Sequence, residues 1–297
     1  MPNKITIVAI AALLVFLGAG VPAAQADEKC SLQTMTGTYV FNERGSSLIA
    51  NPLVQPFPVH MSGALAPFVT VGQVTFNSNG VGNGFYWIRV GSLSGGLDAT
   101  AVQVTIIEMN EDCTGKFRYS IHLPGSSSAT IVEERFVVFD NGREYRSVPT
   151  FIDQTGVPTL AWIGTGRRVS KPGEPVKSCG PQTVHGTYLI TAENIVEVDP
   201  TTAFADTIVF RLNISMTGDY TGMLFEKLGP VSVELPVFGM VTVNPDCSFS
   251  WSLNVQGITT APIKIGGVFF AEGKEFYSMA IEEGIDSSFA QGVRIGQ

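Results

Sequence analysis

The sequence predicts an all-β protein made of two tandem antiparallel up-and-down β-barrels, each with about eight strands. Three observations lead to this fold class. The chain repeats a set of motifs in the same order, apolar and polar residues alternate along short segments, and turn signals are frequent while no long helical stripe occurs. A two-sheet sandwich with about the same number of strands per copy is the competing arrangement.

The repeat begins with C-S-L-Q-T-M-T-G-T-Y at Cys30 to Tyr39, which returns as C-G-P-Q-T-V-H-G-T-Y at Cys179 to Tyr188. Further matches follow in the same order in both copies: Asn110 to Cys113 with Asn244 to Cys247, Asn141 to Ser147 with Glu272 to Ser278, and Gly166 to Val169 with Gly292 to Ile295. Matches in a conserved order indicate duplication of a whole domain. Each copy should therefore fold around its own core.

The first residues have the pattern of a secretory signal. Lys4 precedes a largely apolar run from Ile5 to Leu17, which is too short for a transmembrane helix, and Ala24-Gln25-Ala26 provides a small-x-small cleavage site. We therefore expect residues 1–26 to be a removed signal peptide and the mature protein to be secreted or periplasmic.

Two domains and a linker are expected in the mature chain. The predicted first domain is 27–168 and the predicted second domain is 179–297; the linker 169–178 between them is rich in proline and charge. The net charge of the full chain is −8, and no basic patch is evident. Nucleic acid is therefore not an expected partner. No transmembrane segment is expected in the mature chain, and no oligomeric state is predicted.

Alternation with a period of two locates the strands. In the second copy Cys247, Phe249, Trp251, Leu253 and Val255 alternate with polar residues, which is typical of a half-buried strand. In the first copy the same criteria predict strands at 37–42, 69–76, 84–90, 101–109, 116–123, 130–139, 144–150 and 160–169. Closing such a meander into a barrel removes its exposed edges.

The four cysteines are expected to form one disulfide within each copy. Four cysteines allow three pairings, and the duplication favours Cys30 with Cys113 and Cys179 with Cys247. A metal site or redox pair is not expected, because no two cysteines lie close in sequence and none has a histidine at ligand spacing.

Several short motifs of the first copy resemble those of a known family: Gly37 to Phe41, Pro67 to Phe76 with the turn Asn77 to Gly80, Asp112 to Gly115, Asp140 to Glu144 and Gly164 to Arg168. Together they resemble bacterial secreted proteins with an allene oxide cyclase barrel-like domain, within the calycin superfamily. The second copy matches only at its Gly-Thr-Tyr, Asp246-Cys247, Gly273 to Glu275 and Arg294. No catalytic residue of plant allene oxide cyclases can be aligned, so none is carried over.

The resemblance implies a small barrel able to hold an apolar ligand. It also implies a structural role for Tyr39 with Arg168 and for Tyr188 with Arg294, because in calycins an aromatic on the first strand commonly meets an arginine from the last. Such a contact closes one barrel end through cation–π attraction and burial of the arginine stem. Glu144 and Glu275 are expected to form local ion pairs, with Arg168 or Arg294 as candidate partners.

The most unusual segment runs from Gly45 to Ile88 and contains no Asp, Glu, Lys or Arg. Its first part, 45–68, is apolar and rich in proline, so it is expected to be a long connection rather than a helix. It is interpreted either as a lid over the barrel mouth or as a flap that packs on the other barrel. The candidate residues for the lid and the ligand-binding lining are Phe57, Met61, Leu65, Phe68, Phe85 and Trp87.

The leading functional hypothesis is binding of a small apolar or amphiphilic ligand in the first barrel. An isomerase or cyclase acting on a lipid-like substrate is the alternative implied by the resemblance, and a structural or surface-assembly module is the third. No cofactor or metal is predicted, and no catalytic residue can be assigned. A cluster of polar residues deep in the barrel would favour the enzyme, whereas a barrel filled by its own side chains would exclude it.

Overall fold

The computed structural model describes residues 29–48, 65–90, 93–94, 98–122, 129–153, 160–171, 174, 177–199, 202–228, 231–281 and 288–296. The predicted signal peptide, 1–26, lies outside the described residues, and so does most of the predicted lid, including Phe57 and Met61.

The first copy is a closed antiparallel barrel, since its first strand pairs with the second on one side and with the last on the other. A two-residue strand, β4 (Leu93–Ser94), is added to the edge of β3. The barrel strands are β1 (Gly37–Leu48), β2 (Leu65–Phe76), β3 (Val81–Val90), β5 (Thr100–Met109), β6 (Thr114–His122), β7 (Ala129–Phe139), β8 (Glu144–Asp153) and β9 (Leu160–Ser170).

The second copy closes in the same way, with β10 paired to β11 and to β17. Its strands are β10 (Gly186–Asp199), β11 (Thr202–Ile214), β12 (Asp219–Leu228), β13 (Val231–Val243), β14 (Ser248–Val255), β15 (Ile263–Phe270), β16 (Glu275–Ala280) and β17 (Ser288–Gly296). The prediction of two tandem antiparallel barrels is confirmed, and the sandwich alternative is not adopted. Strand β9 continues through Ser170, into the predicted linker.

The repeated motif builds one end of each barrel. Its cysteine forms a disulfide, Cys30–Cys113 in the first barrel and Cys179–Cys247 in the second, which is the pairing expected from the duplication. Each cysteine is followed by a short helix, η1 (Leu32–Met35) or α2 (Pro181–Val184), which covers the barrel end. Two disulfides indicate an oxidising environment, either extracellular or periplasmic.

The glycine of Gly-Thr-Tyr is required by its backbone. Gly37 has a φ of 127° and Gly186 a φ of 132°. A Cβ atom at Gly37 would lie 2.4 Å from the Ser170 carbonyl oxygen, and one at Gly186 would lie 2.5 Å from that of Gly296. Both positions therefore combine a left-handed conformation with a close backbone approach that only glycine tolerates.

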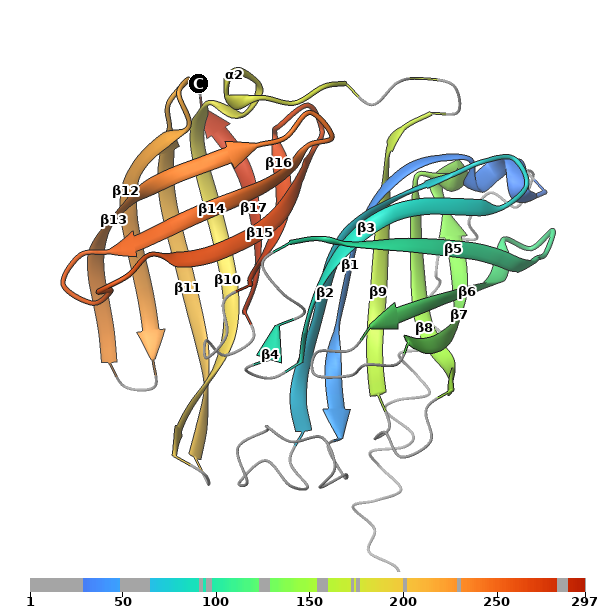
Figure 1. Ribbon diagram of the computed structural model, residues 1–297, viewed down its shortest axis with the longest axis horizontal. Coiled ribbons are helices and arrows are strands. Elements are labelled where there is room, and N and C mark those ends of the chain that lie inside the picture. Colours follow the sequence, from blue (N-terminus) through green and yellow to red (C-terminus); the bar gives the residue numbers. More distant parts are fainter. Residues whose placement is uncertain are drawn as a thin grey trace, which may run out of the picture.

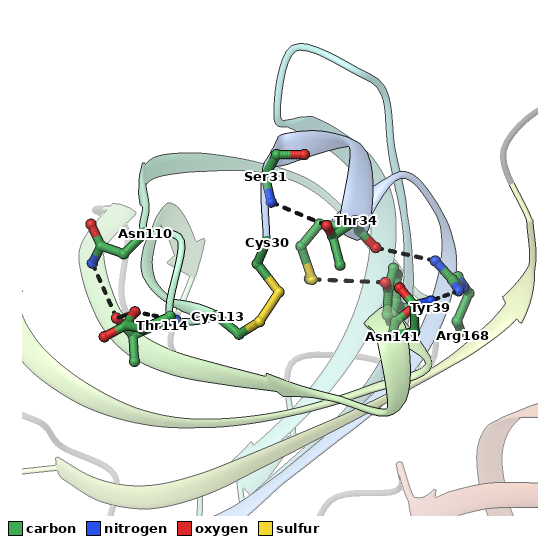
Figure 2. Close-up of a disulfide and its surroundings, with 11 residues drawn as sticks. Cys30, Ser31, Thr34, Tyr39, Asn110, Cys113, Thr114, Asn141 and Arg168 are labelled. Carbon is green, nitrogen blue, oxygen red and sulfur yellow. Dashed lines mark hydrogen bonds between the residues drawn. A yellow bond between two sulfur atoms is a disulfide. The ribbon is translucent and has the colours of Figure 1, made fainter. Parts of the chain in front are cut away.

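The tyrosine and the arginine meet as register partners, Tyr39 opposite Arg168 and Tyr188 opposite Arg294. Figure 2 shows how the first pair closes the barrel end: Arg168 donates to the carbonyl of Thr34 at 3.1 Å and to that of Asn141 at 3.0 Å. The Tyr39 hydroxyl donates to the carbonyl of Gly142 at 2.5 Å, in the turn η3 (Asp140–Gly142). Burial raises the pKa of Tyr39 to about 12, and the nearby Arg168 only partly offsets this.

The two barrels lie side by side (Figure 1) and share a third apolar cluster besides their own cores. Outward-facing residues of β1, β2 and β3 pack against β15, β16 and β17. The buried members are Val40, Val69, Val71, Trp87, Val268, Phe270, Tyr277, Met279, Ile281 and Phe289. A face that would be solvent-exposed in an isolated barrel is therefore core in this chain.

Polar contacts surround this apolar junction. Arg167 forms ion pairs with Glu144 at 3.0 Å and, across the junction, with Glu275 at 2.8 Å. The guanidinium of Arg44 lies 4.5 Å above the ring of Phe289. The expected partners of Glu144 and Glu275 were Arg168 or Arg294; the partner is instead Arg167, because adjacent residues of β9 point to opposite faces and only Arg167 faces the second barrel.

Candidate functional site

The first barrel buries two carboxyl groups in its interior. Glu43 of β1 is 8% exposed and Glu134 of β7 is 1% exposed. Both occupy inward positions of their strands: Glu43 continues the inward series of Tyr39 and Phe41, and Glu134 lies between the inward residues Val132 and Phe136. Unpaired carboxylates are rarely buried, so these groups require specific partners.

The described donors to this pair are a phenol and an indole. Tyr119 Oη donates to Glu134 Oε1 at 2.6 Å and lies 3.2 Å from Glu43 Oε1. Trp162 Nε1 also donates to Glu134 Oε1. Because a phenol has a single hydrogen, Tyr119 satisfies only one of the two carboxyl groups at a time.

Burial raises the pKa of both glutamates, and the two carboxyl groups are close enough to share a proton. The negative charge of Glu134 raises the pKa of Glu43 further, whereas the hydrogen bonds from Tyr119 and Trp162 favour the ionised form of Glu134. Burial therefore favours the protonated form of both carboxyl groups, and mutual repulsion disfavours the state in which both are ionised.

Two hydroxyl groups lie beside the pair without completing its hydrogen bonding. Thr70 favours the ionised form of Glu43, and Ser147 favours that of Glu134. Yet neither Thr70 Oγ1 nor Ser147 Oγ has a partner in hydrogen-bond geometry among the described residues. The site thus contains buried polar atoms with unused hydrogen-bonding capacity.

A cavity of about 30 Å³ adjoins the acidic pair. Its polar lining consists of Glu43, Thr70, Tyr86, Tyr119, Glu134 and Tyr145, and the rest is aliphatic and aromatic. Burial raises the pKa of Tyr86, Tyr119 and Tyr145, and nearby carboxylate charge raises it further, so all three phenols are neutral at physiological pH. A space of this size holds about two water molecules. The interior is therefore largely filled by its own side chains.

The second barrel has apolar residues at the positions of the two glutamates and of Thr70, Tyr119 and Tyr145. Glu43 and Ala192 both lie four residues after the tyrosine of Gly-Thr-Tyr. Tyr119 and Leu253 both lie six residues after a disulfide cysteine. Glu134 and Ile265 both lie eight residues before the turn glycine, which is Gly142 in the first barrel and Gly273 in the second. The strand registers agree, since Glu134 lies opposite Phe117 and Ile265 lies opposite Trp251. Thr70 and Tyr145 correspond in the same way to Ile208 and Phe276, and all five equivalents belong to or pack on the second core. The acidic cluster is thus specific to the first barrel.

The candidate ligand-lining residues occupy different places. Phe68 lies in the first core and its ring stacks on that of Trp162, with centroids 4.8 Å apart. Trp87 is buried at the junction between the barrels, and Phe85 packs against it. Leu65 begins β2, but its side chain lies outside the described residues, as Phe57 and Met61 do entirely. Of the described candidates, only Phe68 is brought near the acidic pair.

The residues of the acidic cluster were absent from the sequence-based candidates, although a signal for two of them existed. Glu43 and Glu134 each interrupt an otherwise apolar inward series of an alternating strand. A charged residue at an inward position is costly unless it is partnered, which marks it for attention. Nothing in the spacing indicates that these two strands bring their carboxyl groups together.

A larger cleft, of about 780 Å³, lies between the predicted linker (169–178) and the second barrel. Gln73 and Ser170 of the first barrel contribute to it, and both have a buried side-chain oxygen without a hydrogen-bond partner among the described residues. Its charged lining is the exposed ion pair of Lys177 with Glu272 and the side chain of Glu174.

In the described residues, no helix has the length and apolar character needed to cross a membrane.

No protein-family model matches the chain, and no curated protein matches it. A protein of unknown function from the DUF3598 family of Nostoc punctiforme is 9% identical, with 90% of this chain and 100% of that chain covered and a TM-score of 0.26. Intact Ap-TbpB, with its N and C lobes, is 8% identical over 88% of this chain and 77% of that chain, with a TM-score of 0.28. An AttH-like protein from Nitrosomonas europaea is 8% identical over 87% of this chain and 92% of that chain, with a TM-score of 0.29. Values of this size carry no argument about ligand or activity.

Proposed function

We propose that this chain is an exported binding protein whose first barrel takes a small amphiphilic ligand, with the polar group of the ligand at the Glu43–Glu134 pair. The observation that supports this most is the difference between the two barrels. The second barrel reaches the same closed fold with Ala192 and Ile265 where the first has the two glutamates. Burying carboxyl groups costs free energy and is not needed to close the barrel, so a role in binding accounts for them better.

The cavity limits the size of the ligand. At about 30 Å³ it accommodates a polar group with a short apolar part against Val74, Val102, Val104 and Ile121. A longer ligand would have to move the stacked rings of Phe68 and Trp162. Both residues lie beside Gly45 in the strand registers, one layer beyond Glu43, toward the end where β1 ends and β2 begins. Entry from that end agrees with the lid interpretation of the 45–68 segment, one of the two given above; residues 49–64 lie outside the described residues.

The test compares the two barrels within one protein. Short n-alkyl compounds with different polar groups are titrated into the protein, and binding is followed by the thermal midpoint and by native mass spectrometry. At least one compound should raise the midpoint, because a ligand that binds only the folded state stabilises it. The double variant Glu43→Ala with Glu134→Ile, which copies the second barrel, should fold and lose this response. The matched control is Glu133→Gln, which removes a carboxyl group from the outer face of the same strand and should keep the response.

Two outcomes would overturn the proposal. One is that no compound in the panel shifts the midpoint or adds mass to the wild-type protein. The other is that the double variant responds as strongly as the wild type, which would place the binding elsewhere.

One observation favours a second candidate, an isomerase or cyclase acting on a lipid-like substrate, as the allene oxide cyclase-like resemblance implies. Two neighbouring buried carboxyl groups whose pKa values are raised by burial are suited to general acid and base roles. The interior is largely filled by its own side chains, which is the outcome expected to count against the enzyme, and the small cavity weighs against a substrate of lipid size. Product analysis after incubation with an epoxidised unsaturated fatty acid decides the matter: turnover no faster than that of Glu134→Gln would eliminate the enzyme.

A further inference from the structure

We infer that the polar group recognised in the first barrel is a primary ammonium, which takes the place of the proton shared by Glu43 and Glu134 and drives that proton into solvent. This inference rests on the proposed binding function and specifies its ligand class. Three features of the site carry it: its excess of hydrogen-bond acceptors, the sign of its charge and the shape of its free space.

The acceptors of the site outnumber its donors. Both described donors from outside the pair, Tyr119 and Trp162, are directed at one atom, Glu134 Oε1. Two carboxyl groups offer about eight acceptor positions in total, so most of the capacity remains for a ligand. A ligand that supplies N–H or O–H groups uses this capacity, whereas a carboxylate would place a further acceptor beside the two glutamates.

Thr70 is a further polar group of the cavity, beside the acidic pair. Its side chain is 2% exposed, it lines the cavity, and Oγ1 has no hydrogen-bond partner among the described residues. A hydroxyl oxygen is an acceptor for a third donor. Two carboxylates and one hydroxyl match the three N–H groups of a primary ammonium, which has no acceptor of its own.

The charge of the site points the same way. The titratable groups that face the cavity are Glu43 of β1, Tyr86 of β3, Tyr119 of β6, Glu134 of β7 and Tyr145 of β8. No Lys, Arg or His belongs to its described lining. An anionic ligand would meet repulsion without compensation, whereas a monovalent cation that replaces the shared proton leaves the net charge of the site unchanged.

The oxygen atoms of the site disfavour a calcium ion. Calcium requires about six to eight oxygen ligands, more than the carboxyl oxygens of the pair and the Thr70 hydroxyl provide. The aliphatic part of the lining contacts a short alkyl chain instead. The ligand class is therefore a short primary alkylamine in its protonated form.

The proposed binding step conserves both protons and charge. The step starts from the pair with one proton and one negative charge, a state that burial and mutual repulsion favour over two ionised carboxylates. When R–NH₃⁺ binds, both carboxyl groups are ionised, the ammonium hydrogens replace the shared proton in the hydrogen bonds, and that proton passes to the buffer. No bond to carbon changes and no oxidant is required.

Isothermal titration calorimetry on the full chain tests this with methylamine, propylamine and butylamine. Propanol, propanoate and tetramethylammonium serve as comparisons of matched size, the last with the same charge but no N–H donor. Measurements in phosphate and in Tris separate the heat of binding from the heat of buffer protonation. The expected result is release of about one proton per bound amine, with affinity falling by up to about tenfold for each pH unit below the pKa of the pair.

The comparison compounds should bind at least about tenfold more weakly than propylamine, since each lacks the charge or the donors. Glu43→Gln and Glu134→Gln should each weaken amine binding by a similar factor and abolish proton release, while Glu133→Gln retains both. Because the panel and the buffer comparison use wild-type protein, a variant that fails to fold does not remove the test.

The outcomes separate this inference from the proposed function. If propanol or propanoate binds as tightly as propylamine, or if amines bind without proton release, the ammonium assignment is overturned and the binding function stands. If none of the compounds binds, both are overturned. If amine binding is unchanged in both glutamine variants, the acidic pair is not the site.

Discussion

Glu133 and Glu134 are adjacent in the sequence and lie on opposite faces of β7. Glu133 points outward and forms an ion pair with Arg118, whereas Glu134 points into the barrel toward Glu43. The one-residue alternation of a strand thus places the same side chain in two contrasting environments. This relationship supplies an internal control for experiments on the acidic pair.

The acidic pair should make stability fall as the pH rises through the weakly acidic range. The pKa of each glutamate is raised by folding above its ordinary value of 4.5. The folded state therefore binds more protons than the unfolded state between that value and the raised pKa of the pair. The stabilising contribution is fully present below 4.5 and is lost as the pH rises through the folded pKa, with a slope of up to about 1.4 kcal/mol per pH unit per proton.

Denaturant unfolding across pH measures this contribution as the difference between the wild type and the double variant Glu43→Gln with Glu134→Gln. The difference curve should slope downward with increasing pH. The slope should persist in Glu133→Gln, which leaves the interior pair in place. A flat or rising difference curve would show that the pair does not hold an extra proton in the folded state.

Each disulfide should contribute strongly to the stability of its own barrel. The sequence separations are 83 residues for Cys30–Cys113 and 68 for Cys179–Cys247. The chain-entropy relation for loops of this length gives about 4 kcal/mol each. Replacing either pair with alanines should lower the free energy of unfolding of the protein by about this amount in guanidinium titrations. A loss below about 1 kcal/mol in either barrel would contradict the assignment of equal roles to the two disulfides.

Trp87 should couple the unfolding of the two barrels. Its ring packs over Gly266 of β15, where an added Cβ would lie 3.0 Å from the indole. Trp87→Ala should cost about 3–5 kcal/mol and separate a single unfolding transition into two, with Trp162 reporting on the first barrel and Trp251 on the second. Ile163→Ala is the control, because Ile163 is 62% exposed and should change stability by no more than about 0.5 kcal/mol. Coincident transitions in the Trp87 variant would refute the coupling role.

The two closing tyrosines should have equal effects on stability. Tyr39 donates to the carbonyl of Gly142, and Tyr188 makes the same bond to Gly273. Replacing either tyrosine with phenylalanine leaves a buried carbonyl without that donor, at a cost of about 1–3 kcal/mol. Thermal or chemical unfolding of both variants measures the two losses. A loss at only one position would mean that the duplicated motif has kept its structural role in only one copy.

The strand pattern of the fold follows from the sequence to a large extent. The alternation of Phe249, Trp251 and Leu253 places β14 correctly, and the shared cysteines and Gly-Thr-Tyr motifs identify the closed end of each barrel. These features are local or are repeated, so one chain contains the comparison needed to interpret them.

The direction in which β3 faces was not predictable by the same means. Phe85 and Trp87 alternate with Tyr86 and Ile88, so both faces of the strand are apolar. Alternation assigns the interior only where the other face is polar. The inward face is that of Tyr86 and Ile88, and the outward face, with Phe85 and Trp87, packs on the second barrel.

The acidic pair depends on pairing that the sequence does not contain. Glu43 and Glu134 belong to β1 and β7, which are separated in the sheet by β8 and β9. Their side chains approach only because the barrel closes and directs them to the same level of its interior. Local patterns mark each glutamate as unusual but do not join them.

The shared cluster at the junction has a practical consequence for dissecting this protein. A first barrel excised from the chain would present Val40, Val69, Val71 and Trp87 to water as one contiguous apolar surface. An excised second barrel would do the same with its own half of the cluster. Patches of this kind promote self-association. Single-barrel fragments should therefore be soluble only as oligomers, unless these outward residues are first replaced with polar ones.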